Sequence, residues 1–129
     1  MRSILLCFLL ISGCSGVDQA KIRANETSAI LQIRTINTAQ VQQFATAAKY
    51  ATKLVDLGPA GANLIPGDVA AGVKDGYRFD LSGDGTMYQV VASPEAPGTS
   101  GKRSFFSDQT LAVRVASGSE AGPTSPELK

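Results

Sequence analysis

The stretch that decides the fold is residues 17–50, which read VDQAKIRANETSAILQIRTINTAQVQQFATAAKY. It contains no Gly or Pro, and apolar side chains return every three or four residues, which is the period of an amphipathic helix. The stripe consists of Ile22, Ala29, Ile33, Ile36, Gln40, Phe44, Ala47, Ala51 and Leu54. The opposite face, predicted to be solvated, consists of Arg23, Glu26, Arg34, Asn37 and Gln42. We therefore predict a helix over residues 20–50.

A helix of this length is long for a chain of 129 residues. Thirty residues span about 45 Å, so the helix either packs along a whole sheet or projects from the globule. Core packing is the interpretation that we favour for most of the stripe, in which Gln40 is the one polar member.

The residues after this helix include several that end helices. Leu-Gly-Pro at residues 57–59 ends the helical region, because Gly suits a C-terminal cap and Pro cannot continue a helix. Residues 58–67 form a connection of small residues. A short helix over residues 68–73, capped by Asp68 and left through residues 74–76, is predicted next.

The hydrophobic period then changes to two. Residues 77–81 and 86–92 alternate apolar and polar side chains around Ser-Gly-Asp-Gly at residues 82–85. Alternation on both sides of turn residues predicts a β-hairpin.

The rest of the chain alternates loops and strands. Residues 93–101 hold Pro, Gly, Ser and Thr, which predicts a long loop. Two further strands are predicted at residues 102–107 and 110–116, and residues 117–129 have the composition of a flexible tail. One helix followed by four antiparallel strands predicts a single α+β domain over residues 20–116.

The first 14 residues have the features of a secretory signal. One Arg precedes an apolar run at residues 4–11, which is too short for a transmembrane helix of about 20 residues. Ile-Ser-Gly-Cys at residues 11–14 resembles the lipobox of bacterial lipoprotein signals. The alternative is the buried start of a helix or strand with an incidental Cys.

The lipobox resemblance implies that residues 1–13 are removed and that Cys14 carries a diacylglyceryl group. Residues 14–19 would then be the tether, and two or three acyl chains anchor a protein stably. Cys7 would leave with the signal, as would one of the 12 basic residues, so that 11 basic and 11 acidic residues remain. Ser15 in place of Asp favours the outer membrane under the enterobacterial sorting pattern, and the choice of membrane stays open.

Composition narrows the classes of function. The chain has no His, so metal sites built on imidazole and Ser-His or Cys-His pairs are excluded. Two early cysteines cannot form a zinc site of four thiolates and argue against a disulfide framework. A net charge of +1 gives no general attraction to nucleic acid. We therefore predict a protein that is not an enzyme, with no catalytic residue, no cofactor and no metal.

Two local motifs are candidate binding sites. Asp-Leu-Ser-Gly-Asp-Gly at residues 80–85 resembles the opening of a calcium loop, but its twelfth position is Val91 where such a loop needs Glu, so a hairpin turn is preferred. Lys102-Arg103 beside Phe105-Phe106 combines basic and aromatic residues. A solvated strand end with one Phe in the core is preferred there, and no nucleic-acid partner is predicted.

A resemblance to a known family covers the chain from about residue 24 to its C terminus. The segments that carry it are NETSA at residues 25–29, LQIRTINTAQ at 31–40, GYRF at 76–79, PEAPGTSG at 94–101, RSFFSDQ at 103–109 and GPTSP at 122–126. In this order they resemble the soluble part of bacterial type IV pilin-like proteins, including the pseudopilins of type II secretion.

The resemblance implies a pilin-like fold, a long N-terminal helix packed on a four-stranded antiparallel sheet. Pilins begin with a prepilin signal and an apolar helix of transmembrane length. Here the lipobox occupies that position, and residues 17–21 are too polar to span. The resemblance therefore implies a pilin-type globule, and it leaves open whether the protein enters a fibre.

The combined prediction is a lipid-anchored envelope protein whose pilin-like domain contacts pilus or type II secretion components. It would lie on the periplasmic side of the inner or outer membrane, or at the cell surface. The alternative is a ligand-binding lipoprotein that uses residues 94–101 or 58–67 as a recognition loop. A small hydrolase with a pair of facing carboxylates is the third possibility.

Overall fold

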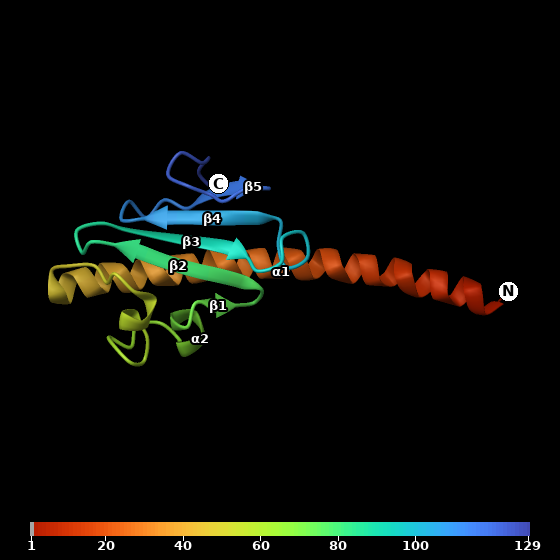
Figure 1. Cartoon of the computed structure of the whole chain (residues 1–129), viewed down its shortest axis with the longest axis horizontal. Coiled ribbons are helices and arrows are strands. Elements are labelled where there is room, and N and C mark those ends of the chain that lie inside the picture. The colour runs from red at the N-terminus through yellow and green to blue at the C-terminus, as the bar shows by residue number, and fades with distance from the viewer. Residues whose placement is uncertain (1) are drawn as a thin grey trace.

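The protein consists of one long helix and a five-stranded antiparallel sheet (Figure 1). In the computed structural model the backbone is described for residues 2–129 and the side chains for residues 18–129. Helix α1 (Arg2–Ala47) is followed by the 3-10 helix η1 (Leu54–Leu57) and the short helix α2 (Gly67–Ala70). The strands are β1 (Val73–Lys74), β2 (Tyr77–Gly83), β3 (Tyr88–Pro94), β4 (Arg103–Asp108) and β5 (Arg114–Ser117). The predicted α+β class is confirmed.

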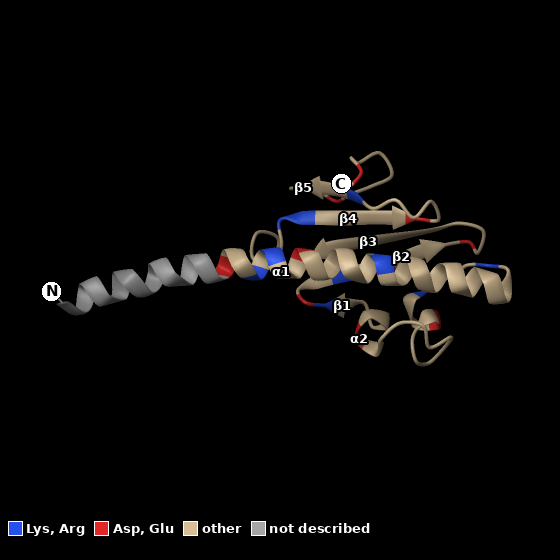
Figure 2. Cartoon of the chain, turned by 180° about the vertical axis from the view of Figure 1, so that it is seen from behind, with Lys and Arg blue, Asp and Glu red and all other residues tan. Residues whose placement is uncertain are grey.

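The sheet is a meander in which each strand pairs with the next, in the order β1-β2-β3-β4-β5. Helix α1 crosses one face of this sheet, behind it in Figure 1 and in front of it in Figure 2. In the view of Figure 2, acidic and basic residues are interspersed along the described elements. Within the described part of the chain, no helix has the length and apolar character that crossing a membrane requires.

The predicted number of strands was wrong, because the sheet has a fifth strand, β1. Its two residues pair with β2, Lys74 opposite Tyr77, across the dipeptide Asp75-Gly76. Both turn residues have positive φ, 50° and 76°, as a two-residue type I′ hairpin turn requires. The sequence pattern had instead predicted a helix over residues 68–73 that ends through residues 74–76, which is where β1 and its turn lie.

The predicted cap of the short helix was also wrong. Helix α2 begins after Pro66, and no side chain caps it. The Asp68 carboxylate instead accepts a hydrogen bond from the Val69 amide (2.8 Å) and pairs with the Lys74 ammonium (2.8 Å). The hydrogen bond from Lys74 lowers the pKa of Asp68 below its ordinary value.

Helix α1 ends at Ala47, three residues before the predicted end at residue 50. Ala48 has a φ of 58°, a conformation that interrupts the helix. The fully buried side chain of Gln40 then holds the returning chain, because its amide accepts from the Ala51 N–H (2.8 Å) and donates to the Ala51 carbonyl (2.9 Å). The one polar residue of the stripe thus satisfies both backbone groups of Ala51, in the chain that follows the helix.

The apolar stripe packs against the sheet along most of its length. Its buried members within α1 are Ile22, Ala29, Ile33, Ile36 and Gln40. Ala51 and Leu54 are also buried, but they follow α1, whereas Phe44 and Ala47 are exposed, contrary to the prediction. The sheet contributes Tyr77, Phe79, Tyr88, Val90, Ala92 and Phe105 to the same core.

Glu26 and Asn37, predicted to face solvent, are buried instead. The Asn37 amide donates to the Ser107 hydroxyl (2.9 Å) and accepts from the Tyr88 hydroxyl (2.8 Å). Ser107 in turn donates to the Ala112 carbonyl (2.8 Å). A polar network therefore joins α1 to β3 and β4 inside the core, and the described residues leave no buried side-chain polar atom without a partner.

The predicted hairpin is confirmed, with its turn two residues later than expected. Strands β2 and β3 pair from Tyr77 opposite Pro94 to Gly83 opposite Tyr88. The Asp84 carboxylate accepts hydrogen bonds from the amide (2.9 Å) and hydroxyl (2.7 Å) of Thr86.

The segment expected to be a tail returns along strand β5. The Val115 amide donates to the Pro126 carbonyl (2.9 Å), and the Leu128 amide donates to the Val113 carbonyl (2.7 Å). Ala121 is buried, and its amide donates to the Ser104 hydroxyl (2.7 Å). Residues near the C terminus thus cover the free edge of the sheet, a contact that the composition did not indicate.

The Asn37 network should be measurable as a stability difference. Asn37→Ala leaves the Tyr88 hydroxyl without a partner in the core and removes the donor to the Ser107 hydroxyl, which keeps its bond to Ala112. We expect a loss of about 1–3 kcal/mol in the free energy of unfolding. Thr38→Ala is the matched control, because Thr38 is exposed on the same turn, and it should change stability by less than about 0.5 kcal/mol. Urea unfolding measures both. Equal losses for the two variants would contradict the assignment.

Candidate functional site

Polar contacts gather where α1 meets two loops that are distant in sequence. We call this region the α1 junction and define it by residues 18–28 of α1, residues 75–76 of the β1–β2 turn and residues 96–103 before and at the start of β4. Its contacts join residues that lie 47 to 77 positions apart along the chain.

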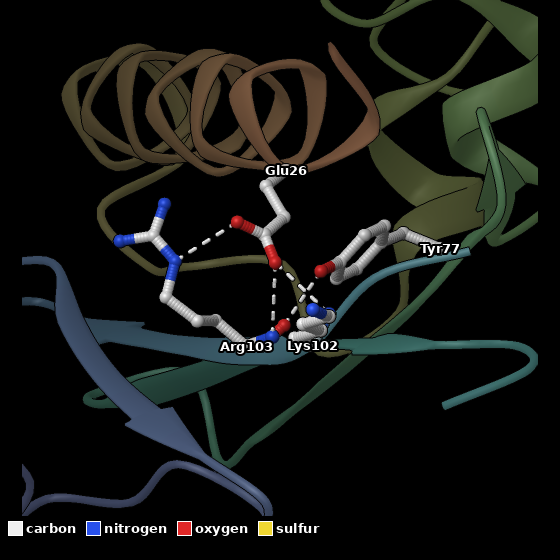
Figure 3. A network of polar contacts seen from close by, with 4 residues as sticks. All are labelled: Glu26, Tyr77, Lys102 and Arg103. Carbon is white, nitrogen blue, oxygen red and sulfur yellow. Dashed lines mark hydrogen bonds and ion pairs between the residues drawn. The ribbon is translucent and has the colours of Figure 1, made fainter. Parts of the chain in front are cut away.

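The Glu26 carboxylate is the centre of the α1 junction (Figure 3). One oxygen accepts hydrogen bonds from the backbone amides of Lys102 (2.9 Å) and Arg103 (3.1 Å), and the other pairs with the Arg103 Nε (3.0 Å). Both oxygens are therefore bound, and the Glu26 side chain is only 8% exposed. Hydrogen bonds of this charged kind are about twice as strong as neutral ones, so Glu26 fixes α1 to the start of β4.

Tyr77 completes this network from β2. Its hydroxyl donates to the Arg103 carbonyl (2.6 Å), and the Arg103 guanidinium lies 5.3 Å from the centre of the Phe105 ring. Burial raises the pKa of the Tyr77 phenol above its ordinary value, and the nearby Glu26 charge raises it further. A side chain at Gly101 would collide with the Tyr77 hydroxyl, so glycine is required there.

Two further residues of α1 hold the loops at the α1 junction. The Asn25 amide donates to the Ser100 carbonyl (3.0 Å), and the Ser28 hydroxyl donates to the Asp75 carboxylate (2.6 Å). Gly76 has a positive φ and lies close to Ser100 and Asn25, where a Cβ atom would be crowded. The β1–β2 turn and the loop before β4 therefore have fixed positions against α1.

An open cleft of about 410 Å³ lies beside these contacts. We call it the junction cleft. It is lined by Asp18, Lys21, Asn25, Asp75, Gly76, Thr99 and Ser100. Two carboxylates, one ammonium and hydroxyl groups thus face one space at the end of the α1 segment for which side chains are described.

A second groove, of about 380 Å³, lies on the sheet face that α1 does not cover. We call it the open-face groove. Its charged lining residues are Arg78, Asp80, Lys102 and Glu120, and Pro94 and Pro97 lie beside them. None of the four takes part in the two ion pairs that the described side chains form, Lys74–Asp68 and Arg103–Glu26.

The residue with the most specific predicted role, Cys14, lies outside the residues whose side chains the structure describes. Its lipidation therefore stays a prediction. The predicted tether, residues 14–19, is helical backbone within α1.

The motif that resembles a calcium loop is a hairpin turn in the structure. The Asp84 carboxylate binds Thr86 and the Met87 amide (3.0 Å), and these hydrogen bonds lower its pKa below the ordinary value. Asp80 lies on β2 and lines the open-face groove. Among the described side chains no group of three or more potential metal ligands occurs.

The structure separates the members of the basic and aromatic motif at the start of β4. Arg103 binds Glu26, while Lys102 is exposed at the open-face groove. Phe105 belongs to the main core, and Phe106 is buried although only one Phe was expected to be. Arg103 and Lys102 thus have different surroundings and do not form one binding surface.

Pairs of carboxylates do line clefts, as the hydrolase possibility requires. Asp18 and Asp75 line the junction cleft, and Asp80 and Glu120 line the open-face groove. All four side chains are exposed. Catalytic pairs depend on different environments that push the two pKa values apart, and four exposed carboxylates offer no such difference in burial.

Sequence reasoning missed Glu26, Tyr77 and Asn25 as junction residues. A single Glu on a helix is usually solvated, and its partners lie 76 and 77 positions away. One local signal existed, since Gly76 and Gly101 flank the loops that α1 contacts.

In comparisons with protein families, curated proteins and solved structures, no family model matches this chain, and no protein or structure shows significant similarity to it. Function is therefore inferred from the residues and their geometry.

The Glu26 network predicts that substitution of Glu26 destabilises the start of β4. Glu26→Gln replaces one acceptor oxygen by an NH₂ group that faces other donors, so we expect a loss of about 2–3 kcal/mol in the free energy of unfolding. Amide hydrogen exchange at Lys102 and Arg103 should become faster. Glu95→Gln is the control, because Glu95 is exposed in the same loop region. Similar losses in both variants would refute a special role of Glu26.

The buried tyrosines predict alkaline sensitivity. Burial raises the pKa of Tyr77 and Tyr88 in the folded state, so folding favours the neutral phenols. Their stabilising effect is complete below the unfolded pKa of about 10 and falls as the pH rises above it, by up to about 1.4 kcal/mol per pH unit for each. Urea unfolding between pH 9 and 11.5 measures this slope. Tyr77→Phe should reduce the slope, and an unchanged slope would contradict the assignment.

Proposed function

We propose that this protein is a lipid-anchored envelope protein whose pilin-like domain acts by contact with other proteins and not by catalysis. The observation that carries the proposal is the combination of Ile-Ser-Gly-Cys at residues 11–14 with an α+β domain in which one long helix lies along an antiparallel sheet. The first feature is typical of a lipoprotein signal, and the second is the arrangement that the pilin-like resemblance implies.

The anchor would be the diacylglyceryl group on Cys14, exposed as the first residue after removal of residues 1–13. Because α1 includes residues 14–19, a short helical stretch would join the lipid to the domain. The protein would then work at the periplasmic side of the inner or outer membrane, or at the cell surface, with its domain held close to the bilayer.

Contact with partner proteins is supported by apolar side chains on the surface of α1. Leu31 and Val41 are 59% and 49% exposed, and Phe44 is 43% exposed. Leu111, in the loop between β4 and β5, is 49% exposed with a φ of 70°, an unusual conformation for a leucine. Pilus or type II secretion components are the class of partner that the resemblance suggests.

A non-catalytic role rests on the chemistry of the sequence and the clefts. The chain has no His, and the acidic residues that line its clefts are exposed. Exposed carboxylates of this kind are better suited to binding a partner than to proton transfer in catalysis.

A second candidate function is supported by the open-face groove. Pro94 and Pro97, from the region predicted as a recognition loop, lie beside Arg78, Asp80 and Lys102. Opposite charges that face one groove suit a small zwitterionic ligand. A ligand-dependent rise in melting temperature that disappears in Arg78→Gln would favour this function over protein contact.

The lipid anchor is tested by fractionating cells that produce the full chain. Cys14→Ser removes the only attachment point that the lipobox provides, so we expect the protein to leave the membrane fraction and its mass to lack the acyl chains. Cys7→Ser is the matched control, because Cys7 precedes the predicted cleavage site, and it should leave both localisation and mass of the processed protein unchanged. Membrane retention of Cys14→Ser would refute the anchor.

A further inference from the structure

The junction cleft lies near the predicted lipid attachment point. Asp18 lines the cleft, and Cys14 precedes it by four residues. Four residues of fully extended chain span at most about 14 Å, so a lipid on Cys14 holds this end of the domain at the bilayer surface. This inference rests on the proposed lipidation.

The lining of the junction cleft matches the chemistry of a phospholipid head group. Lys21 offers an ammonium group for a phosphate, and Thr99 offers a hydroxyl donor. The carboxylates of Asp18 and Asp75 offer acceptors for an ammonium group. A volume of about 410 Å³ lies within the usual range for small-molecule sites.

We propose that the junction cleft binds the head group of an ethanolamine phospholipid in the membrane that carries the protein. Two acidic residues and one basic residue line the cleft, which gives it a formal charge of −1. Such a cleft disfavours an anionic head group without an ammonium. It also favours ethanolamine over choline, because a quaternary ammonium cannot donate hydrogen bonds to Asp18 or Asp75.

The walls of the junction cleft are held in place before any lipid binds. Asn25 binds the Ser100 carbonyl, Ser28 binds Asp75, and Glu26 holds the start of β4. A site whose groups are already positioned loses less entropy on binding. Head-group binding at these loops would also orient the domain, with the junction at the bilayer and the far end of α1 away from it.

The test uses the full lipidated chain in vesicles, with one reporter at each end of the domain. Ala96→Cys, at an exposed residue beside the cleft that is not part of its lining, and Lys49→Cys each introduce a thiol, and both are labelled with bimane. Residues 18 and 47 of α1 are separated by about 44 Å along the helix, so Lys49→Cys is the distant control. Vesicles contain phosphatidylcholine alone, or with phosphatidylethanolamine or phosphatidylglycerol, and a lipid with a nitroxide on its head group quenches the label.

We expect quenching at position 96 to exceed quenching at position 49 at least threefold and to be strongest with phosphatidylethanolamine. Lys21→Gln should reduce the quenching at position 96 at least twofold, whereas Arg23→Gln, an exposed residue that does not line the cleft, should not. Equal quenching at both positions, or no preference for phosphatidylethanolamine, would overturn the head-group site.

The mass of the processed chain separates this inference from the proposed function. A chain that carries acyl groups on Cys14 but shows equal quenching at positions 96 and 49 refutes the head-group site alone. A chain without acyl groups refutes the anchor, and the head-group site with it.

Discussion

The carboxylate of Glu26 joins α1 to the start of β4, and we infer that this contact sets the position of the helix on the sheet. The steps between Ile22, Ala29, Ile33 and Ile36 are seven, four and three residues, each close to one or two turns of the helix. Apolar burial alone therefore distinguishes poorly between positions of α1 that differ by one turn. Hydrogen bonds distinguish well between these positions of the helix, because a buried charged group that is displaced from its donors costs several kcal/mol of stability. Glu26 binds the start of β4, whereas Asn37 and Gln40 bind the far end of the sheet and the returning chain. We infer that these polar residues fix the register of the helix on an otherwise permissive apolar surface.

The same network explains how the loops near the amino-terminal end of the described domain can form a site. Residues 96–103 contain one Pro, two Gly, one Ser and one Thr, a composition that alone would allow many conformations. Tyr77 and Glu26 hold the end of this loop, and Asn25 holds its middle. The order of the junction cleft is therefore supplied by α1 together with hydrogen bonds within the loop, which join Ala96 to Ser100 and Gly98 to Gly101.

Much of the fold could be predicted from the sequence, because periodicity reports which side chains are buried. The helix, the hairpin and the two later strands follow from periods of 3.6 and two. Strand β1 escaped prediction because Asp75-Gly76 was interpreted as a helix exit although Asp-Gly is a strong hairpin signal. The end of α1 at Ala48 has no such signal. The candidate site was beyond prediction, since Glu26 resembles any solvated helix residue until β4, more than 70 positions away, is placed against it.

The return of the C-terminal segment along β5 has a practical consequence for handling the protein. An unpaired edge strand is a template for association with other chains, and residues 126–128 occupy part of this edge through backbone hydrogen bonds. Leu128, which is next to the last residue, also packs against the core. An affinity tag fused directly after Lys129 would begin beside this contact and compete with it. A tag inserted among the exposed residues at 60–63 would avoid both the edge strand and the predicted amino-terminal signal.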